Sequence, residues 1–379
     1  MPTAVTPSER LDSLDLQTQD SQLYPELNSE TTNSFVSELT ENITLFSEPM
    51  DVRAVSINRP TARQWLLHLA LFIATAITTT ISGIIWCGSS EIAAPGEAPV
   101  QSGSLVVSIL LIPWYYVRGI GELVWQALTH PALLMPGLEF SASLLAILTA
   151  HEFGHYFFCR YYGVNATLPF FIPQPPGLLP GTFGAFIKMK SPVPSRRALF
   201  DIGLAGPIAG FIVIIPIAFA GVLRLQHGNI MPGESGGITF NDPLLFRLIA
   251  HAFKIDLATG IVNSFYLAAW VGLLVTALNL MPVGQLDGGH GTFAAFGRAA
   301  HHWIGRVAFV TMVALSVLGY LWHGSPSGIL YVVLLAVMLR VHHPQPERME
   351  PLGTMRVAIG IITLIVFALC FLPFPITIS

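Results

Sequence analysis

Seven long apolar runs restrict this chain to a narrow range of folds. A helix needs about 20 apolar residues to cross the hydrocarbon core of a bilayer. Only 11% of the residues are charged, whereas a soluble domain carries roughly 25%. The sequence therefore predicts an all-α polytopic membrane protein with about seven transmembrane helices in the lipid bilayer. We place these helices at 65–86, 139–162, 199–223, 261–281, 304–323, 326–341 and 355–375.

One further stretch, 103–135, is apolar only in its first part. The short run 105–117 contains Pro113 and is soon followed by Arg118 and Glu122. The tryptophans and tyrosines of this stretch are typical of a membrane interface. We expect a re-entrant or interfacial segment here, and the sequence leaves open whether it spans the membrane.

Basic residues gather in alternate connections between the apolar runs. They lie in 163–198, after 281 and around 341–356, whereas the connection 87–104 holds acidic charges only. Cytoplasmic loops of membrane proteins are enriched in Lys and Arg. The pattern therefore predicts a cytoplasmic N-terminus and a C-terminus on the outer side of the membrane.

The first 62 residues differ in composition from the rest of the chain. They are rich in Ser, Thr, Gln, Asn and acidic residues and contain no lysine. Such a segment cannot bury enough apolar surface to offset the entropy lost on ordering. It also lacks the basic start and short apolar core of a secretory signal peptide. We expect a disordered acidic tail over 1–62, acting as a linker or a docking arm, and one membrane domain over 63–379.

Composition excludes two kinds of function. The net charge is −4 and no basic block occurs, which excludes nucleic-acid binding. The three cysteines lie far apart and form no C-x-x-C pair. The sequence therefore supports neither a disulfide framework nor a cysteine zinc cluster.

The run 139–162 contains three ionisable side chains, those of His151, Glu152 and His155. Ionisable groups inside a membrane span are costly and mark functional sites. Histidines four residues apart lie on one face of a helix and can hold one metal ion, with Glu152 beside them to activate water. This H-E-x-x-H pattern is typical of zinc peptidases. The alternative is a pair of histidines that form hydrogen bonds between packed helices.

A hydrolytic zinc site needs a third protein ligand. The candidates are Cys159, Asp201, Asp287, His290, His301 and His302. Cys159 is eight residues from His151, about 12 Å along a helix, which is too far to share one ion. Asp201 has the position of a helix cap or an ion-pair partner. Asp287 lies in a stretch rich in Pro and Gly, where the helix must break at membrane depth. We therefore predict Asp287 as the third ligand and one zinc ion per chain.

Two motifs together resemble the site-2 protease family of intramembrane zinc metalloproteases. These motifs are His151-Glu-Phe-Gly-His155 and Asn279-x-x-Pro282-x-x-x-Leu286-Asp287-Gly288. The resemblance covers about 139–290 and implies that both histidines and Asp287 bind zinc and that Glu152 is catalytic. It also implies that 63–379 is a metalloendopeptidase domain. Its substrates would be single-span membrane proteins, cleaved within their transmembrane segments in regulated intramembrane proteolysis.

The resemblance further points to residues that bind substrate. Asn279 corresponds to an asparagine near the metal in that family, although it could equally cap the broken helix. Gly184, Ala185 and Phe186 resemble the family's membrane-associated β-hairpin, which takes up an unwound substrate as an added strand. Two short apolar stretches around a Pro- and Gly-rich turn in 168–190 predict such a hairpin, with a surface loop as the alternative.

Two remaining features predict structural roles. The spacing of Gly203, Gly206 and Gly210 gives the run 199–223 a small-residue face suited to helix packing. His301 and His302 are expected to be solvated in a cytoplasmic loop.

Two other classes of function stay open. In a membrane transporter the same ionisable residues would line a permeation path, but no internal repeat pairs 139–223 with 261–341. A catalytically inactive scaffold of the same fold would be expected to have lost one of the four site residues, and this chain keeps them all. We expect a bacterial inner membrane as the location, because no transit peptide is recognisable. The sequence names neither the substrate nor the trigger nor the oligomeric state.

Overall fold

The structure is a computed structural model of the whole chain. It describes residues 60–88, 105–177, 180–227, 238–341 and 346–378. By their internal contacts, Met1–Ala54 and Val55–Ser379 form two units. Residues 1–59 of the predicted tail over 1–62 lie outside the described residues. All elements given below belong to the second unit.

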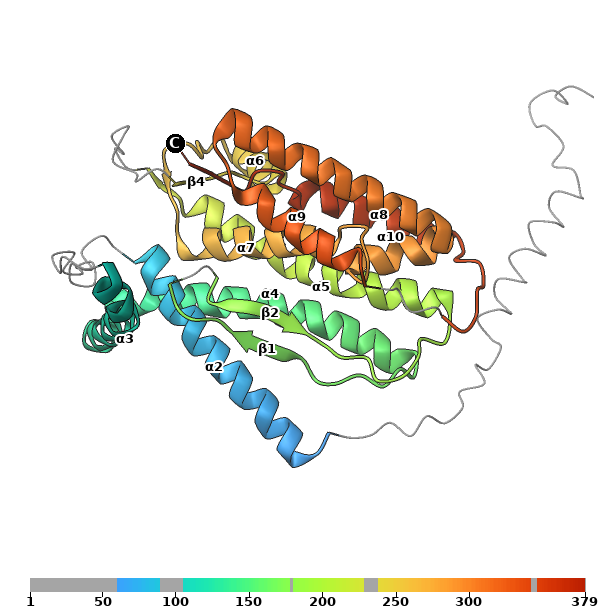
Figure 1. Cartoon of the computed structure of the whole chain (residues 1–379), viewed down its shortest axis with the longest axis horizontal. Coiled ribbons are helices and arrows are strands. Elements are labelled where there is room, and N and C mark those ends of the chain that lie inside the picture. The colour runs from blue at the N-terminus through green and yellow to red at the C-terminus, as the bar shows by residue number, and fades with distance from the viewer. Residues whose placement is uncertain (1–59, 89–104, 178–179, 228–237, 342–345, 379) are drawn as a thin grey trace, which may run out of the picture. The chain divides into compact units, whose positions relative to one another are not determined.

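The described residues fold mainly into helices, as the sequence predicts (Figure 1). Their nine helices are α2 (Ala62–Cys87), α3 (Leu105–Thr129), α4 (Pro131–Tyr161), α5 (Arg196–Leu223), α6 (Leu244–Phe253), α7 (Ser264–Asn279), α8 (Asp287–His323), α9 (Ser327–Met338) and α10 (Thr354–Cys370). Their short strands are β1 (Phe170–Pro173), β2 (Thr182–Phe186), β3 (Gln226–His227), β4 (Ile238–Phe240), β5 (Gly260–Ile261) and β6 (Ile376–Ile378).

Polar side chains fix the starts of the two helices that follow the long loops. The Ser195 hydroxyl accepts a hydrogen bond from the N–H of Ala198 at the start of α5. Asn263 does the same for Tyr266 in α7 and also donates to the carbonyl of Gly221 at 2.8 Å. Such caps satisfy N–H groups that have no partner within the helix. The second bond of Asn263 ties the start of α7 to the end of α5.

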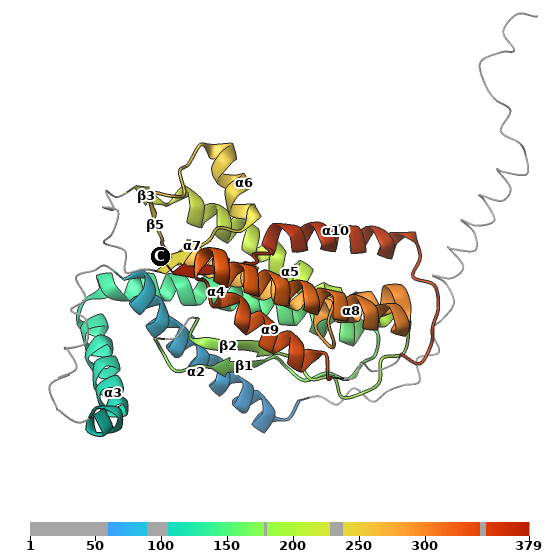
Figure 2. The same cartoon turned by 45° about the horizontal axis from the view of Figure 1, so that its top comes forward.

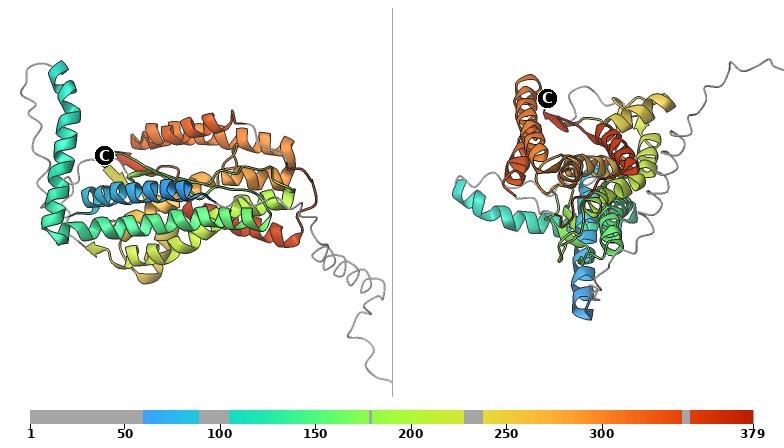
Figure 3. Two further views of the ribbon diagram at one scale, coloured as in Figure 1. Left: turned by 90° about the horizontal axis from the view of Figure 1, so that it is seen from below. Right: turned by 90° about the vertical axis from the view of Figure 1, so that its right-hand side faces the viewer.

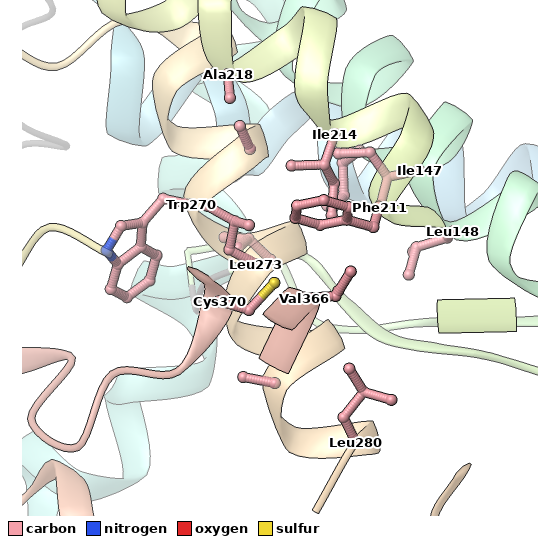
Figure 4. Close-up of a cluster of buried hydrophobic side chains, with 14 of the residues drawn as sticks. Ile147, Leu148, Phe211, Ile214, Ala218, Trp270, Leu273, Leu280, Val366 and Cys370 are labelled. Carbon is pink, nitrogen blue, oxygen red and sulfur yellow. The ribbon is translucent and has the colours of Figure 1, made fainter. Parts of the chain in front are cut away.

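The core forms where α4, α5 and α7 lie side by side, and α10 closes part of it (Figures 1 and 4). Ile147 of α4, Ile214 of α5 and Leu273 of α7 are at most 2% exposed. Gly272 leaves space for the first two, since a Cβ there would come within 2.9 Å of Ile147 Cδ1. This close packing fixes α4, which carries both histidines of the motif, against its two neighbours.

Four helices in the described part of the chain are long and apolar enough to cross a membrane. They are α2, α4, α5 and α8, and each overlaps a predicted span. The other three predicted spans coincide with α7, α9 and α10, which have only 16, 12 and 17 residues. A helix of 16 residues is about 24 Å long, shorter than the hydrocarbon core of about 30 Å. That these three helices also cross the membrane stays a prediction.

The stretch 103–135, expected to be re-entrant or interfacial, is mostly the continuous helix α3, which includes Pro113. α3 projects away from the other helices and is steeply inclined to α2 and α4 (Figures 2 and 3). Its path relative to the membrane stays a prediction. The next helix, α4, begins at Pro131 rather than at 139 as expected, because Pro is well tolerated in the first turn of a helix.

Two regions are more ordered than the sequence suggests. The connection 224–260, for which the sequence analysis predicts no helix or strand of its own, contains β3, β4 and α6. β3 pairs with β5, while β4 pairs antiparallel with β6 near the C-terminus, Ile238 opposite Ile378. Helix α8 begins at Asp287, ahead of the predicted span 304–323, and is interrupted at Gly297, where φ is +79°.

The predicted hairpin is present as β1 and β2. The two strands are antiparallel, with Phe170 opposite Phe186. β1 lies along α2, where His68 Nδ1 is 2.9 Å from the carbonyl oxygen of Pro169. The hairpin therefore lies beside a candidate membrane span, and its own contact with the membrane stays a prediction.

Candidate metal centre

The two histidines of the H-E-x-x-H pattern lie one turn apart on α4. The rings of His151 and His155 stand edge to face, and their Nε2 atoms are 3.1 Å apart. Both residues are buried, with exposed fractions of 5% and 7%. Two imidazole nitrogens thus converge on one point inside the helical core.

The third side chain of the site comes from the break between α7 and α8. α7 ends at Asn279, and the chain turns tightly before α8 begins at Asp287. Gly284 has φ +55°, a conformation that favours glycine. A Cβ at Gly288 would overlap the carbonyl oxygen of Leu280. The turn therefore requires glycines, and it presents Asp287 toward α4.

The Asp287 carboxylate completes a group of three potential metal ligands. Its Oδ2 atom is 3.2 Å from Nε2 of His151 and 3.4 Å from Nε2 of His155. A tetrahedral zinc ion with bonds of about 2.0–2.1 Å holds its ligand atoms about 3.3 Å apart. Two imidazole nitrogens and one carboxylate oxygen at these distances fit such an ion and leave one position open. No other such group of His, Cys, Asp or Glu occurs in the described ranges.

Glycines of α5 make the space that both imidazole rings occupy. A Cβ at Gly206 would overlap the His155 ring, and one at Gly210 would come within 3.3 Å of His151 Cβ. On α4, a Cβ at Gly154 would come within 2.5 Å of the Ala205 carbonyl oxygen. The small-residue face of α5 therefore packs closely on a helix, as predicted, and it also forms one wall of the metal centre.

A backbone carbonyl of α5 orients one imidazole. The Nδ1 atom of His155 is 2.7 Å from the carbonyl oxygen of Ile202. Because a carbonyl can only accept, Nδ1 donates, and the lone pair of neutral His155 then lies on Nε2, which faces Asp287. Sequence reasoning missed this contact, because no residue type marks a carbonyl that serves in this way.

Glu152 lies beside the group of three rather than within it. It is 5% exposed, and the backbone N–H of Ile187 lies near its carboxylate. Ile187 directly follows β2. A buried carboxylate next to two candidate metal ligands can take up a proton from a water molecule there, and the end of β2 approaches the same point.

Of the residues predicted to bind substrate, Asn279 lies beside the donor group and the other three lie on β2. Nδ2 of Asn279 is 3.4 Å from Nε2 of His151. Gly184 and Ala185 are partly buried and Phe186 is exposed, all three on β2. Among the described strands, β2 pairs with β1 alone, so its second edge has no strand partner. The binding of substrate by these four residues stays a prediction.

The other candidate ligands lie outside the group of three. Asp201 forms an ion pair with Arg356, which agrees with the role predicted for it. His301, expected to be solvated, is only 5% exposed and lies 3.0 Å from the Thr292 hydroxyl. That expectation was wrong because α8 continues through residues taken as a loop. Cys159 is buried and one turn beyond His155, too far along α4 to join His151.

A helical bundle that brings two buried histidines and one partly buried aspartate together in a single group is typical of a membrane protein with an internal metal site. Residues 139–319 match the model of Peptidase family M50, and this segment contains all three donors and Glu152. The segment that carries the site is therefore similar to Peptidase family M50, the family of the site-2 proteases, which confirms the resemblance inferred from its motifs.

Several curated plant proteins are similar to this chain. Probable zinc metalloprotease EGY1, chloroplastic, from Oryza sativa subsp. japonica is 31% identical over 252 residues, 64% of this chain and 42% of that protein. Its namesake from Arabidopsis thaliana is 31% identical over 243 residues, 62% of this chain and 43% of that protein. Probable zinc metalloprotease EGY2, chloroplastic, from Arabidopsis thaliana is 28% identical over 262 residues, 66% of this chain and 44% of that protein. The match thus spans less than half the length of these relatives. No solved structure matches the chain.

Proposed function

We propose that this chain is an intramembrane zinc metalloendopeptidase with one zinc ion per chain. The observation that carries the proposal is the meeting of His151, His155 and Asp287 beside Glu152 within a core of apolar helices. The match of 139–319 to Peptidase family M50 and similarity to relatives named as zinc metalloproteases support it. We assign this activity to a domain over 63–379, with the tail 1–62 outside it.

The chemistry follows from the side chains around the donor group. Zinc bound there would supply a Lewis acid that polarises the scissile carbonyl and acidifies water. Glu152 accepts a proton from the attacking water and returns it to the leaving amide nitrogen, as a general base and then a general acid. The carbonyl of Ile202 holds His155 in one tautomer throughout. Packed apolar helices around the site restrict the access of water.

Single-span membrane proteins are the substrates that this arrangement favours. A helical substrate must be unwound before its peptide bond can be attacked, and an unpaired strand edge can hold the extended segment. β2 offers such an edge, and the N–H of Ile187 next to it already reaches Glu152. We therefore assign substrate binding to Gly184, Ala185 and Phe186 of the hairpin and to Asn279 at the centre.

Seven membrane crossings agree with two contacts between distant parts of the chain. β4 pairs with β6, so 238–240 and 376–378 must lie on one side of the membrane. Five helices lie between them, of which α7 to α10 are the predicted spans, and four crossings return the chain to the same side. Ser195 forms a bridge with Arg348, and four of the five helices between them, α5, α7, α8 and α9, are predicted spans. This parity supports termini on opposite sides of the membrane, and the basic residues of the loops assign the N-terminus to the cytoplasm and the C-terminus to the outer side.

We propose a bacterial inner membrane as the location. The chloroplast named for the plant relatives belongs to those proteins. Fractionation of the source cells, with the protein followed by an antibody, tests this assignment, and recovery from another membrane would overturn it.

Metal content per chain tests the proposed site without any known substrate. We expect about one zinc in the detergent-purified parent protein and none in Asp287→Ala or His155→Ala, because each variant removes one of three ligands. Zinc that survives Asp287→Ala would remove the third ligand from the proposal. Parent protein without zinc would favour the transporter or the inactive scaffold instead.

Activity tests the role of Glu152 separately. Glu152→Gln keeps the size of the side chain but cannot accept a proton, so it should retain zinc and lose cleavage. We expect a fall on the order of 10²–10⁴-fold in the cleavage rate of a single-span substrate in lipid vesicles. Cleavage by Glu152→Gln at the parent rate would contradict a peptidase mechanism based on this residue.

A further inference from the structure

A partly buried polar cluster joins three helices near the metal centre. Arg356 of α10 binds Asp201 of α5 through two nitrogens, with Nε 2.9 Å from Oδ1 and Nη2 2.7 Å from Oδ2. Tyr162, directly after α4, donates its hydroxyl to the same carboxylate and accepts from Arg356 Nη2 at 3.1 Å. The side chains of Arg356 and Asp201 are only 19% and 10% exposed.

The cluster is connected to the metal centre through the backbone. Asp201 directly precedes Ile202, whose carbonyl orients the His155 imidazole. Tyr162 is seven residues beyond His155, two turns or about 10 Å along the same face of α4. The same faces of α4 and α5 are therefore joined twice, once by His155 with Ile202 and once by Tyr162 with Asp201.

We propose that Arg356 is a positioning residue of the metal centre, acting through Asp201 and Tyr162. Its two hydrogen bonds fix the Asp201 side chain. They thereby also fix the position of the first turns of α5 relative to the end of α4. The Ile202 carbonyl then stays in the position along α4 where it accepts a hydrogen bond from His155 Nδ1. This bond keeps Nε2 of the same ring directed toward Asp287. The inference rests on the proposed zinc site.

Stability alone gives a weaker explanation of this cluster. Apolar residues of similar size often stabilise a fold as well as a buried ion pair does, because charges lose solvation on burial. The attachment of α10 to α5 also has other bonds. Arg197 Nε donates to the Pro351 carbonyl at 2.8 Å, and the N–H of Arg196 donates to the Arg348 carbonyl at 2.9 Å. These other bonds already hold α5 to the segment before α10. The two-nitrogen contact between Arg356 and Asp201 therefore serves in addition to align α5 against α4.

Arg197 provides a matched control for the test. Like Arg356, it joins α5 to the segment around α10, through the Pro351 carbonyl and a 4.0 Å ion pair with Glu350. None of its bonds involves Asp201. Arg197→Gln therefore removes bonds between α5 and the segment before α10, and it leaves the hydrogen bonds of Arg356 to Asp201 in place.

The test measures zinc affinity by competition with a chelator, and the visible spectrum of the cobalt-substituted full chain. We expect Arg356→Gln to weaken zinc binding about tenfold, near the lower end of the range for groups behind metal ligands. We also expect a shift of the cobalt bands, since they report ligand geometry. Arg356→Lys, which keeps the charge but loses the two-point grip, should shift the bands too. Arg197→Gln should match the parent in both measurements.

Several outcomes would overturn the inference. It fails if Arg356→Gln and Arg356→Lys bind zinc and give cobalt spectra as the parent does, or if Arg197→Gln weakens zinc equally. Should Arg356→Gln not fold, the milder Tyr162→Phe decides, because it removes one hydrogen bond to Asp201 and keeps the ion pair. A Tyr162→Phe protein with lowered thermal stability and parental cobalt bands would assign the cluster to folding. A parent that binds no metal would defeat the proposed function itself, a different result.

Discussion

Gly206 shows how a missing side chain can shape a site. Its hydrogen points at the His155 ring, in the place where any other residue would put a Cβ. Glycine is ordinarily a poor choice inside a helix, less favourable than Ala by roughly 0.5–1 kcal/mol. Its use at this position is explained by the imidazole, which needs the space to lie between α4 and α5.

Gly206→Ala should therefore behave opposite to its helix propensity. The added methyl group meets the His155 ring, and such overpacking costs about 1–3 kcal/mol of stability or moves the ring away from Asp287. We expect loss of bound zinc together with a lowered unfolding temperature. Zinc analysis and thermal unfolding of the purified variant check this expectation.

Gly360→Ala in α10 is the control for that substitution. A Cβ there would meet Phe200 Cζ at 3.7 Å, an ordinary contact. This variant should keep its zinc and be as stable as the parent or more so by up to about 1 kcal/mol. Equal zinc content in the two variants would show that Gly206 does not shape the centre.

The site could be predicted from sequence where a side chain was chemically out of place. His151, Glu152 and His155 stand out because charged groups are costly in an apolar run. Asp287 stands out because it follows a forced break in a helix. The carbonyl of Ile202 could not be predicted, since every residue has one and the choice depends on how α5 is aligned against α4. The prediction that His301 is solvated was wrong for a related reason, because the burial of this side chain depends on the packing of α8.

At the scale of elements, the β1–β2 hairpin is the part that brings backbone to Glu152. The N–H groups of alternate residues in a strand point to the same edge. Ala185 therefore directs its N–H to the same edge as Ile187, whose N–H reaches Glu152. A substrate that binds as an added strand would use the N–H of Ala185.

Ala185→Pro should lower kcat/KM for a membrane substrate and leave the zinc content unchanged. Proline removes one donor from the free edge, and one hydrogen bond contributes about 0.5–1.5 kcal/mol, up to roughly tenfold in rate. Ala185→Ser keeps the N–H and should cleave at close to the parent rate. Thermal unfolding of both variants shows whether the hairpin survives. Parental kcat/KM in a well-folded Ala185→Pro protein would rule out strand addition at this edge.

The elements that sequence reasoning missed are the ones whose order depends on distant partners. α6 has only 10 residues, and it lies in a connection with little else to suggest structure. β4 has three residues and is stabilised by β6, more than 130 positions further along the chain. Helices such as α2 and α5 could be predicted because the bilayer requires their length, which their own sequences show.

At the scale of the whole chain, contacts between distant segments restrict the topology. Arg196 donates to the carbonyls of Ala294 and Ala295, next to the interruption of α8 at Gly297. Together with the bridge between Ser195 and Arg348, this contact places the start of α5, the first part of α8 and the segment before α10 on one side. The basic residues in these segments agree with the cytoplasmic side.

Labelling with a membrane-impermeant maleimide tests this topology, in a chain whose three natural cysteines are replaced. Lys190, Lys254 and Met349 are exposed in the structure, and each is changed to Cys in a separate variant. In intact cells of a bacterial host we expect Lys254→Cys to be labelled. In the proposed topology α5 crosses the membrane from the cytoplasm, so Lys254, which follows it, lies on the outer side. Lys190→Cys and Met349→Cys should react only after the membrane is permeabilised. Different sidedness for Lys190 and Met349 would contradict the contact between 195 and 348, whereas labelling of all three together would mean that α5 does not cross.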